Sequence, residues 1–179
     1  MKNSLRNIQS CDSAAVLLGL EGEAASVYFS VFDELILQQK NIFYFHGRNK
    51  RPPLDNVNAL LSFAYSLLAG MCASALETVG LDEYVGFYHT DRPGRISLAL
   101  DLMEEFRSVM ADRFVLTLIN KKIMKESCFT KKENGAVILN EDGRKLFLKF
   151  WQEKKQEPIT HPFLKEKIEC YWQDICVGI

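Results

Sequence analysis

The chain has 179 residues, and its 22 Lys and Arg against 23 Asp and Glu leave a formal net charge of −1, so any nucleic-acid-binding surface must be local. Apolar residues make up 47% of the chain and charged residues 25%, which excludes a disordered protein and fits one globular domain. No run of about 18 uninterrupted apolar residues occurs, so the sequence predicts no membrane span.

The first predicted element is a long amphipathic helix that begins after Asp12 or Ser13, either of which can cap it, and fades near Gln38. Glu21 lies among its apolar residues beside Gly22, and a glycine inside a helix often marks a close contact. The apolar positions recur at steps of three and four residues: Leu17, Leu20, Ala24, Val27, Tyr28, Val31, Leu35 and Ile36.

A turn over residues 46–53 follows, because Pro52 and Pro53 are incompatible with a helix interior. The turn is basic and contains Arg48, Lys50 and Arg51. Asp55 is a suitable N-cap for a second helix over about residues 56–79. That helix is apolar on almost every side, which is typical of the buried centre of a bundle.

A third helix, with Ser97 as its expected N-cap, is predicted to run with a bend to about Asn120. Its β-branched run over residues 114–119 also fits a strand, although we favour a helix. A short extended piece over residues 135–139 and helices over about 141–156 and 162–177 complete the chain. The predicted fold class is all-α: a single domain, residues 1–179, bundled around one buried helix with at most one short β element.

Four residues are candidates for chemistry. Asp101, Glu104 and Glu105 share one helix face, and His89 lies in the loop before that helix. Clustered carboxylates repel one another unless a cation neutralises them, and Mn²⁺ or Mg²⁺ binds such oxygens. The simpler interpretation is a solvated acidic helix start paired with nearby arginines. Spacing alone favours the simpler interpretation and leaves Glu21 ambiguous.

The five cysteines are odd in number, widely spread and form no CxxC pair. This usage is typical of thiols that serve as small core residues in a reducing cytoplasm. We therefore expect a cytoplasmic protein without a disulfide framework or a zinc finger.

Several collinear blocks together resemble the catalytic α-helical domain of the CRISPR-associated integrase, the metal-dependent DNA endonuclease of spacer acquisition. The wording of residues 91–95 (DRPGR) and 161–164 (HPFL) is similar to the type I-C branch. The blocks are GLEGEAA at 19–25, RNKRPPLDNVNALLSFAYSLL at 48–68, residues 80–89, RPGR at 92–95 and SLALDLMEEFR at 97–107.

The resemblance implies a Mn²⁺ or Mg²⁺ site formed by Glu21, His89 and Glu104, with Asp101 assisting the catalytic group. In that family a DNA 3′-hydroxyl or water attacks a phosphodiester bond. Asn58 matches a family position and is expected either to cap a helix or to support the site from behind. Tyr28 is expected to pack in the core, with lining of the active site by its hydroxyl as the alternative. The candidate DNA-phosphate contacts are Arg92, Arg95, Arg48, Lys50 and Arg51.

The implied partners are double-stranded DNA, as spacer precursor and CRISPR repeat, and a small ferredoxin-like companion protein. Family members form homodimers, chiefly through an N-terminal β-rich domain that we expect this chain to lack. The main alternative is a catalytically idle helical remnant that docks onto protein or DNA. A generic helical scaffold is a weaker third interpretation.

Overall fold

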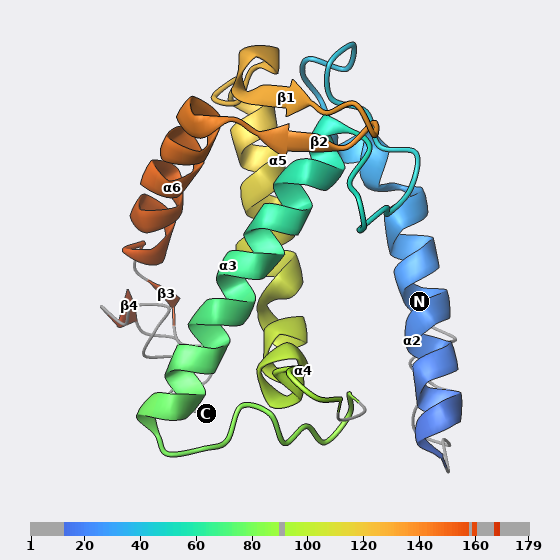
Figure 1. The fold of residues 1–179 in the computed structure, drawn as a ribbon, viewed down its shortest axis with the longest axis vertical. Coiled ribbons are helices and arrows are strands. Elements are labelled where there is room, and N and C mark those ends of the chain that lie inside the picture. The colour runs from blue at the N-terminus through green and yellow to red at the C-terminus, as the bar shows by residue number, and fades with distance from the viewer. Residues whose placement is uncertain (1–12, 90–91, 158, 161–166, 169–179) are drawn as a thin grey trace.

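The computed structural model describes residues 13–89, 92–157, 159–160 and 167–168. The mostly helical fold class is confirmed, with two short antiparallel strand pairs beside the helices (Figure 1). In chain order the elements are α2 (Ala14–Ser30), η1 (Phe32–Leu35), α3 (Asn56–Thr78), α4 (Ser97–Phe106), η2 (Arg107–Asp112), α5 (Arg113–Asn120), η3 (Glu126–Cys128), β1 (Phe129–Lys131), β2 (Val137–Leu139), α6 (Glu141–Lys155), β3 (Ile159–Thr160) and β4 (Lys167–Ile168).

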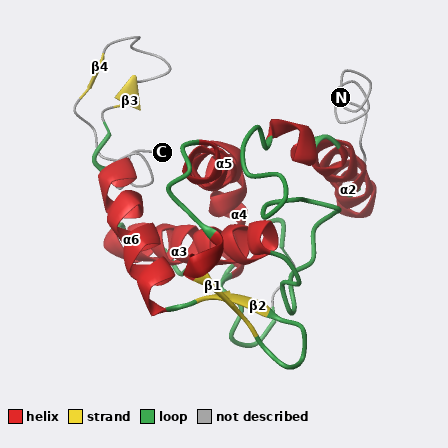
Figure 2. Ribbon diagram, turned by 90° about the horizontal axis from the view of Figure 1, so that it is seen from above, coloured by secondary structure: helices red, strands yellow, loops and turns green. Residues whose placement is uncertain are grey.

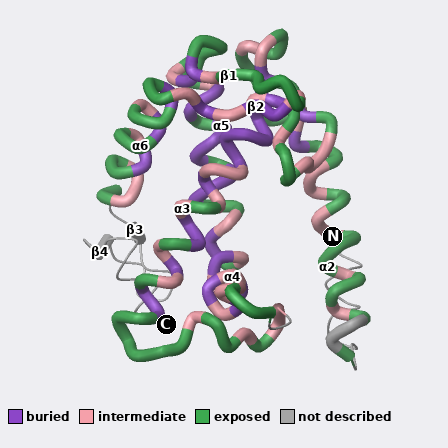
Figure 3. Tube along the Cα trace, in the orientation of Figure 1, coloured by how far each residue is buried: buried purple, intermediate pink, exposed green. Residues whose placement is uncertain are grey.

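Helix α3 is the central helix, as the sequence predicted (Figures 1 and 3). The carboxylate of Asp55 caps its start by accepting the N–H of Asn58 at 2.7 Å, so the predicted N-cap is confirmed. By length and composition, helix α3 is also apolar enough to cross a membrane, although its apolar residues do not form one uninterrupted run. Half of its most apolar window is buried inside the protein, and core helices commonly pass this test.

Elements α4, η2 and α5 form one bent column that packs against α3 (Figures 1 and 2). The bend is a π-helical turn over Arg107–Asp112, a wider turn than the α-helix on either side. The segment 114–119 is helical, as we favoured. Ser97, however, does not cap α4, because Ile96 occupies the cap position and Ser97 is the buried first residue of the helix.

Strands β1 and β2 pair antiparallel, and β2 contains most of the predicted extended piece over 135–139. Helix α6 then packs on the core through the ring of Phe147, which contacts Phe63 of α3 and Phe114 of α5. Trp151 adds a second ring from α6 against Phe114. These aromatic contacts join α3, α5 and α6 into one hydrophobic core.

Helix α2 lies beside this core (Figures 1 and 2). Its cap, Ser13, agrees with the prediction, but the helix ends at Ser30 and a 3₁₀ turn follows, so it is shorter than predicted. Its side chains described by the structure are half-buried or exposed, including Val16 and Val27, which are 54% and 48% exposed (Figure 3). The predicted apolar face of the helix is therefore only partly covered.

The predicted helix over 162–177 lies mostly outside the described residues. Within it, Lys167–Ile168 is a strand that pairs antiparallel with Ile159–Thr160, so at this point the helix prediction is wrong. Among the described cysteines, Cys72 and Cys128 are buried, as expected for core thiols.

Candidate functional site

The carboxylate of Asp101 organises the loop that precedes α4. The backbone N–H groups of Phe87 and Tyr88 donate to its Oδ2 atom, and that of His89 donates to its Oδ1 atom, each at 2.9 Å. Burial alone would raise the pKa of Asp101, but these bonds and the one from the His89 ring together hold it below its ordinary value. Asp101 is therefore an ionised acceptor that fixes three consecutive residues.

The ring of His89 is oriented by the same carboxylate. Its Nδ1 atom lies 2.6 Å from Oδ1 of Asp101, whose side chain is fully buried while the histidine side chain is 23% exposed. An ionised carboxylate can only accept, so Nδ1 carries the proton and Nε2 is the nitrogen left to face a ligand. This carboxylate–histidine pairing is the arrangement that commonly supports a metal-binding histidine.

Gly86 is required where this loop approaches α4. A Cβ atom at Gly86 would lie 2.6 Å from the Cβ of Ser97 and 2.9 Å from the carbonyl oxygen of His89. The glycine therefore allows the loop to lie close enough for its N–H groups to reach Asp101.

Glu104 lies one turn after Asp101 on α4 and is 27% exposed at its side chain. Burial raises its pKa, and the negative charge of Glu21 raises it further, whereas the positive charge of Arg107 lowers it. Arg107 Nη1 lies 2.6 Å from Oε2 of Glu104, so the two form an ion pair within the same helical column. The pairing of an arginine with this acidic face, which the simpler interpretation of the sequence expected, is thus present for Glu104.

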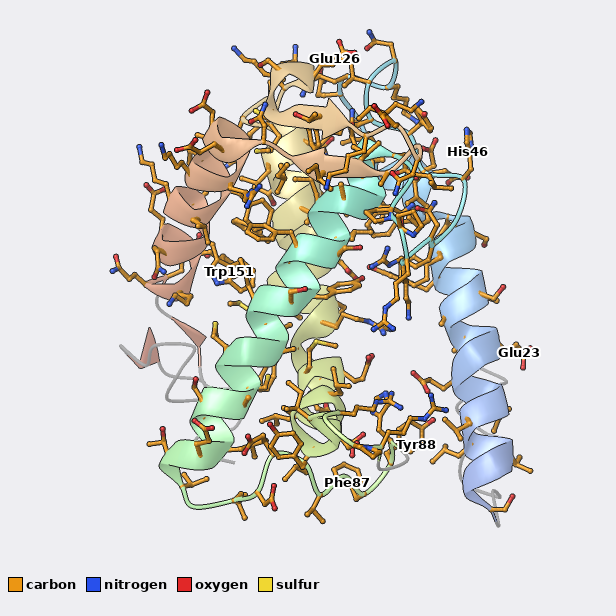
Figure 4. The ribbon with its side chains drawn as sticks, viewed as in Figure 1. Glu23, His46, Phe87, Tyr88, Glu126 and Trp151 are labelled. Atoms are coloured by element: carbon orange, nitrogen blue, oxygen red, sulfur yellow. The ribbon has the colours of Figure 1, made fainter. Side chains whose placement is uncertain are left out.

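Glu21 reaches the same region from α2. The hydroxyl of Tyr88 donates to its Oε2 atom at 2.8 Å, and Figure 4 shows Tyr88 on the loop facing α2, whereas Glu23 points away from the core. Burial, as the largest cause, together with this bond and the neighbouring acidic charges, raises the pKa of Tyr88 to about 12. A Cβ atom added at Gly22 would meet no described atom from outside its own helical turn within 4 Å, so the close contact suggested by that glycine is not found among the described residues.

Four predicted site residues thus lie in one region but do not form a complete metal-coordination site: Glu21, His89, Asp101 and Glu104. Within the described part of the chain, no three His, Cys, Asp or Glu side chains form a group able to hold a metal ion. The donor set nevertheless fits Mn²⁺ or Mg²⁺, because it offers two carboxylates and one oriented imidazole. Besides burial, the negative charge of Glu21 contributes to the raised pKa of Glu104. A bound cation would relieve this repulsion between the two carboxylates.

The predicted phosphate contacts differ in how free their side chains are. Lys50, Arg51 and Arg92 are exposed and Arg95 is half-buried. The charge of Lys50 acts on Glu104, which places the basic turn within electrostatic range of the acidic residues. A groove of about 550 Å³ joins these regions, and it is lined by Glu21, Gly22, Ala25, Ser26, Phe29, Ser30, His46, Gly47, Arg48, Lys50 and Arg107.

Arg48 has partners within the protein. Its Nη1 atom donates to the side-chain oxygen of Asn58 at 2.7 Å and its Nη2 atom to Ser62 at 3.0 Å, while the guanidinium lies 5.2 Å from the centre of the Tyr65 ring. Its Nε atom is buried and has no hydrogen-bond partner among the described residues. Arg48 therefore holds the basic turn against α3, and a DNA contact would compete with these bonds.

Asn58 acts within the same turn and helix start. Its side chain donates to the carbonyl oxygen of Gly47 at 2.9 Å and to Asp55 Oδ2 at 2.7 Å, and its oxygen accepts the N–H of Asn49. The structure thus gives Asn58 a capping and turn-forming role, one of its expected roles.

The sequence interpretation did not single out three residues near this site: Tyr88, which bonds to Glu21, and Tyr65 and Asp112 farther from it. Tyr28 and Tyr65 donate their hydroxyls to the two oxygens of Asp112, at 2.9 and 2.6 Å. The available signal was the position of Asp112 directly after the apolar residues Met110 and Ala111, because a charge on a buried helix face needs partners.

Comparison with known proteins adds the family context. Residues 1–153 match the protein family described as CRISPR associated protein Cas1. The CRISPR-associated endonuclease Cas1 2 of Rhodospirillum rubrum is 53% identical over 167 residues, which cover 93% of this chain and 48% of that relative. CRISPR-associated endonuclease Cas1 1 of Chlorobaculum tepidum is 51% identical over 164 residues, covering 92% of this chain and 48% of the relative. The chain spans about half the length of these two relatives.

Solved structures share the fold over almost the whole chain. A casposase bound to an integration product superimposes with a TM-score of 0.87 at 28% identity, covering 98% of this chain and 48% of that chain. A Cas1 protein from Thermotoga maritima gives a TM-score of 0.84 at 27% identity, with 99% and 53% covered. A chain of a partial Cas6-RT-Cas1–Cas2 complex gives 0.84 at 24% identity, covering 99% of this chain and 51% of that chain, a likeness that concerns the fold alone.

Proposed function

Because the chain belongs to the Cas1 family of CRISPR-associated proteins, we propose that it is the catalytic region of a metal-dependent DNA endonuclease and integrase of spacer acquisition. The observation that carries the proposal is the placement of Glu21, His89 and Glu104. They come from a helix, a loop and a second helix, and they lie in one region of the folded chain.

Glu21, His89 and Glu104 are the residues that would hold Mn²⁺ or Mg²⁺. When bound, such an ion lowers the pKa of an attacking water or DNA 3′-hydroxyl and stabilises negative charge on the phosphate. Asp101 fixes the proton of His89 on Nδ1 and so presents Nε2. Arg107 balances the charge of Glu104 when no other cation is present.

The DNA partner in this proposal is bound through its phosphates by Lys50, Arg51, Arg92 and Arg95. Such contacts position DNA without reading its sequence. The likeness to a casposase bound to an integration product supports DNA as substrate. A small ferredoxin-like CRISPR companion and a second copy of the chain are the proposed protein partners, and the type I-C branch is the proposed subtype.

The proposal is tested by titrating the 179-residue protein with Mn²⁺. An ion that binds only the native state at 100 times its Kd stabilises that state by about 2.7 kcal/mol, which corresponds to a rise in Tm on the order of 5–10 °C. We expect Glu21→Gln, His89→Ala and Glu104→Gln each to abolish most of this rise and to abolish metal-dependent DNA cleavage.

Glu23→Gln is the matched control, because Glu23 lies on the same helix as Glu21 but points away from the core (Figure 4). It should keep the full Mn²⁺ response. Absence of any Mn²⁺-induced change in Tm for the folded wild-type protein would refute the metal site. Binding of Mn²⁺ with no cleavage of any DNA substrate would retain the site and refute the endonuclease.

A further inference from the structure

We propose that Asp112 is a positioning residue that, through Tyr28, places α2 and with it Glu21 relative to α4. The inference rests on the proposed metal site, because it assigns the support of one of its ligands. Within the described part of the chain, Asp112 forms no hydrogen bond with the residues proposed to hold the metal, and its partners are the two tyrosine hydroxyls.

The carboxylate of Asp112 is built into the protein interior. The residue is 0% exposed, and one tyrosine hydroxyl donates to each of its oxygens. Burial raises its pKa above the ordinary value, and the bonds from Tyr65 and Tyr28 offset only part of this rise. A buried carboxylate is costly unless its hydrogen-bonding capacity is satisfied, so each hydroxyl is held firmly in place.

Tyr28 transmits this anchor to Glu21 because both residues belong to α2. They are seven residues apart, about two helical turns, and so they lie on the same face. The other hydroxyl bond on this face joins Tyr88 to Glu21. Between these points none of the α2 side chains that the structure describes is buried. Next to Tyr28 the ring of Phe29 also packs against Phe45, at 5.6 Å between ring centres, and the two hydroxyl bonds are the directed contacts that hold the stretch from Glu21 to Tyr28.

The second hydrogen bond of Asp112 joins it to α3 and not to α2. Tyr65 belongs to α3, and its ring lies under the guanidinium of Arg48 in the basic turn. Tyr28→Phe and Tyr65→Phe therefore each remove one hydroxyl from the same carboxylate, yet only the first change loosens the helix that carries Glu21. The two variants form a matched pair.

The test measures the Mn²⁺ Kd of wild type, Tyr28→Phe and Tyr65→Phe from the electron paramagnetic resonance signal of free Mn²⁺. We expect Tyr28→Phe to weaken binding about tenfold, the lower end of the range for loss of a group bonded directly to a metal ligand, because Tyr28 acts one step further away. Tyr65→Phe should stay within about twofold of wild type. Asp112→Ala should weaken binding at least as much as Tyr28→Phe, because neither hydroxyl then has its carboxylate acceptor.

Hydrogen exchange without metal provides the independent arm. The amides of residues 18–27 should exchange faster in Tyr28→Phe than in Tyr65→Phe. Equal Kd values for the two variants, or equal exchange in α2, would overturn the inference. If wild type and Glu21→Gln bind Mn²⁺ equally, the proposed metal site fails, while the exchange comparison still decides whether Asp112 places α2.

Discussion

The carboxylate of Asp101 is hidden from solvent and accepts four hydrogen bonds from three consecutive residues. Its spacing from Glu104 was readable in the sequence, because residues three apart share a helix face. The sequence did not show that the Asp101 side chain points towards the loop, because the N–H groups that it accepts come from residues 12 to 14 positions earlier. The sequence thus identified the residue, whereas its supporting role required the folded loop.

Acid unfolding tests this role of Asp101. Its pKa lies below the ordinary value in the folded state, so its stabilising contribution is present above the unfolded pKa of about 3.9 and is lost as the pH falls through the lower folded value. We expect Asp101→Asn to lower the free energy of unfolding at pH 7 by about 3 kcal/mol. The gap to wild type should narrow on acidification.

Urea unfolding at several pH values measures that gap. Glu104 and Asp112 have raised pKa values and respond in the opposite sense, but they are present in both proteins and cancel in the comparison. The exposed Glu105→Gln serves as control and should show no gap at any pH. A gap that stays constant down to pH 2 would contradict the assignment of the low pKa to Asp101.

At the scale of secondary-structure elements, helix starts and apolar periodicity were predictable and helix ends were less so. Asp55 and Ser13 cap as expected, because local hydrogen bonds decide a helix start. Helix α2 ends at Ser30 although the apolar pattern continues, since the next residues turn into the core, where Phe32 packs against Phe45. The π turn at Arg107–Asp112 packs against α3, and the sequence predicted only a bend in this helix, without its place or its width.

The start of α6 gives a prediction at this scale. A Cβ atom at Gly143 would lie 2.2 Å from the carbonyl oxygen of Cys128, which is backbone and must move. We expect Gly143→Ala to destabilise the protein by about 2–3 kcal/mol despite the better helix propensity of alanine.

Gly70→Ala in α3 is the matched change, because no described atom lies within 4 Å of the added Cβ atom. It should be neutral or stabilise by up to about 1 kcal/mol. Thermal unfolding of the two variants decides the point. A Gly143→Ala protein as stable as wild type would mean that α6 starts farther from Cys128.

At the scale of the whole molecule, the bundle around α3 was predictable from composition, but the meeting of distant segments was not. Tyr88 bonds to Glu21 across 67 positions, and Tyr28 bonds to Asp112 across 84. No periodicity contains such pairings. The family resemblance supplied the expectation that Glu21 and His89 belong together, which spacing alone left open.

The single core predicts a separation of stability from metal binding. Phe147 is 0% exposed and joins α6 to α3 and α5, so Phe147→Ala should lower the free energy of unfolding by about 3–5 kcal/mol. The neighbouring Leu148, 37% exposed, should cost less than about 1 kcal/mol on the same change. Urea midpoints measure both.

The folded fraction of Phe147→Ala should still bind Mn²⁺ with the wild-type Kd, because the contacts of α6 lie outside the candidate site. A changed Kd in that variant, at a temperature where it is folded, would show that the site depends on the distant end of the core.

The wide turn between Glu104 and Asp112 makes the number of residues as important as their identity. A change that restored a regular α-helix there without removing a residue would rotate everything beyond it by about 100° relative to Glu104. Asp112 would then face away from both tyrosines while every local propensity improved. We therefore expect this stretch to accept exchanges of exposed residues such as Ser108 and Val109 far more readily than a single-residue insertion, which would rotate Asp112 by a similar angle.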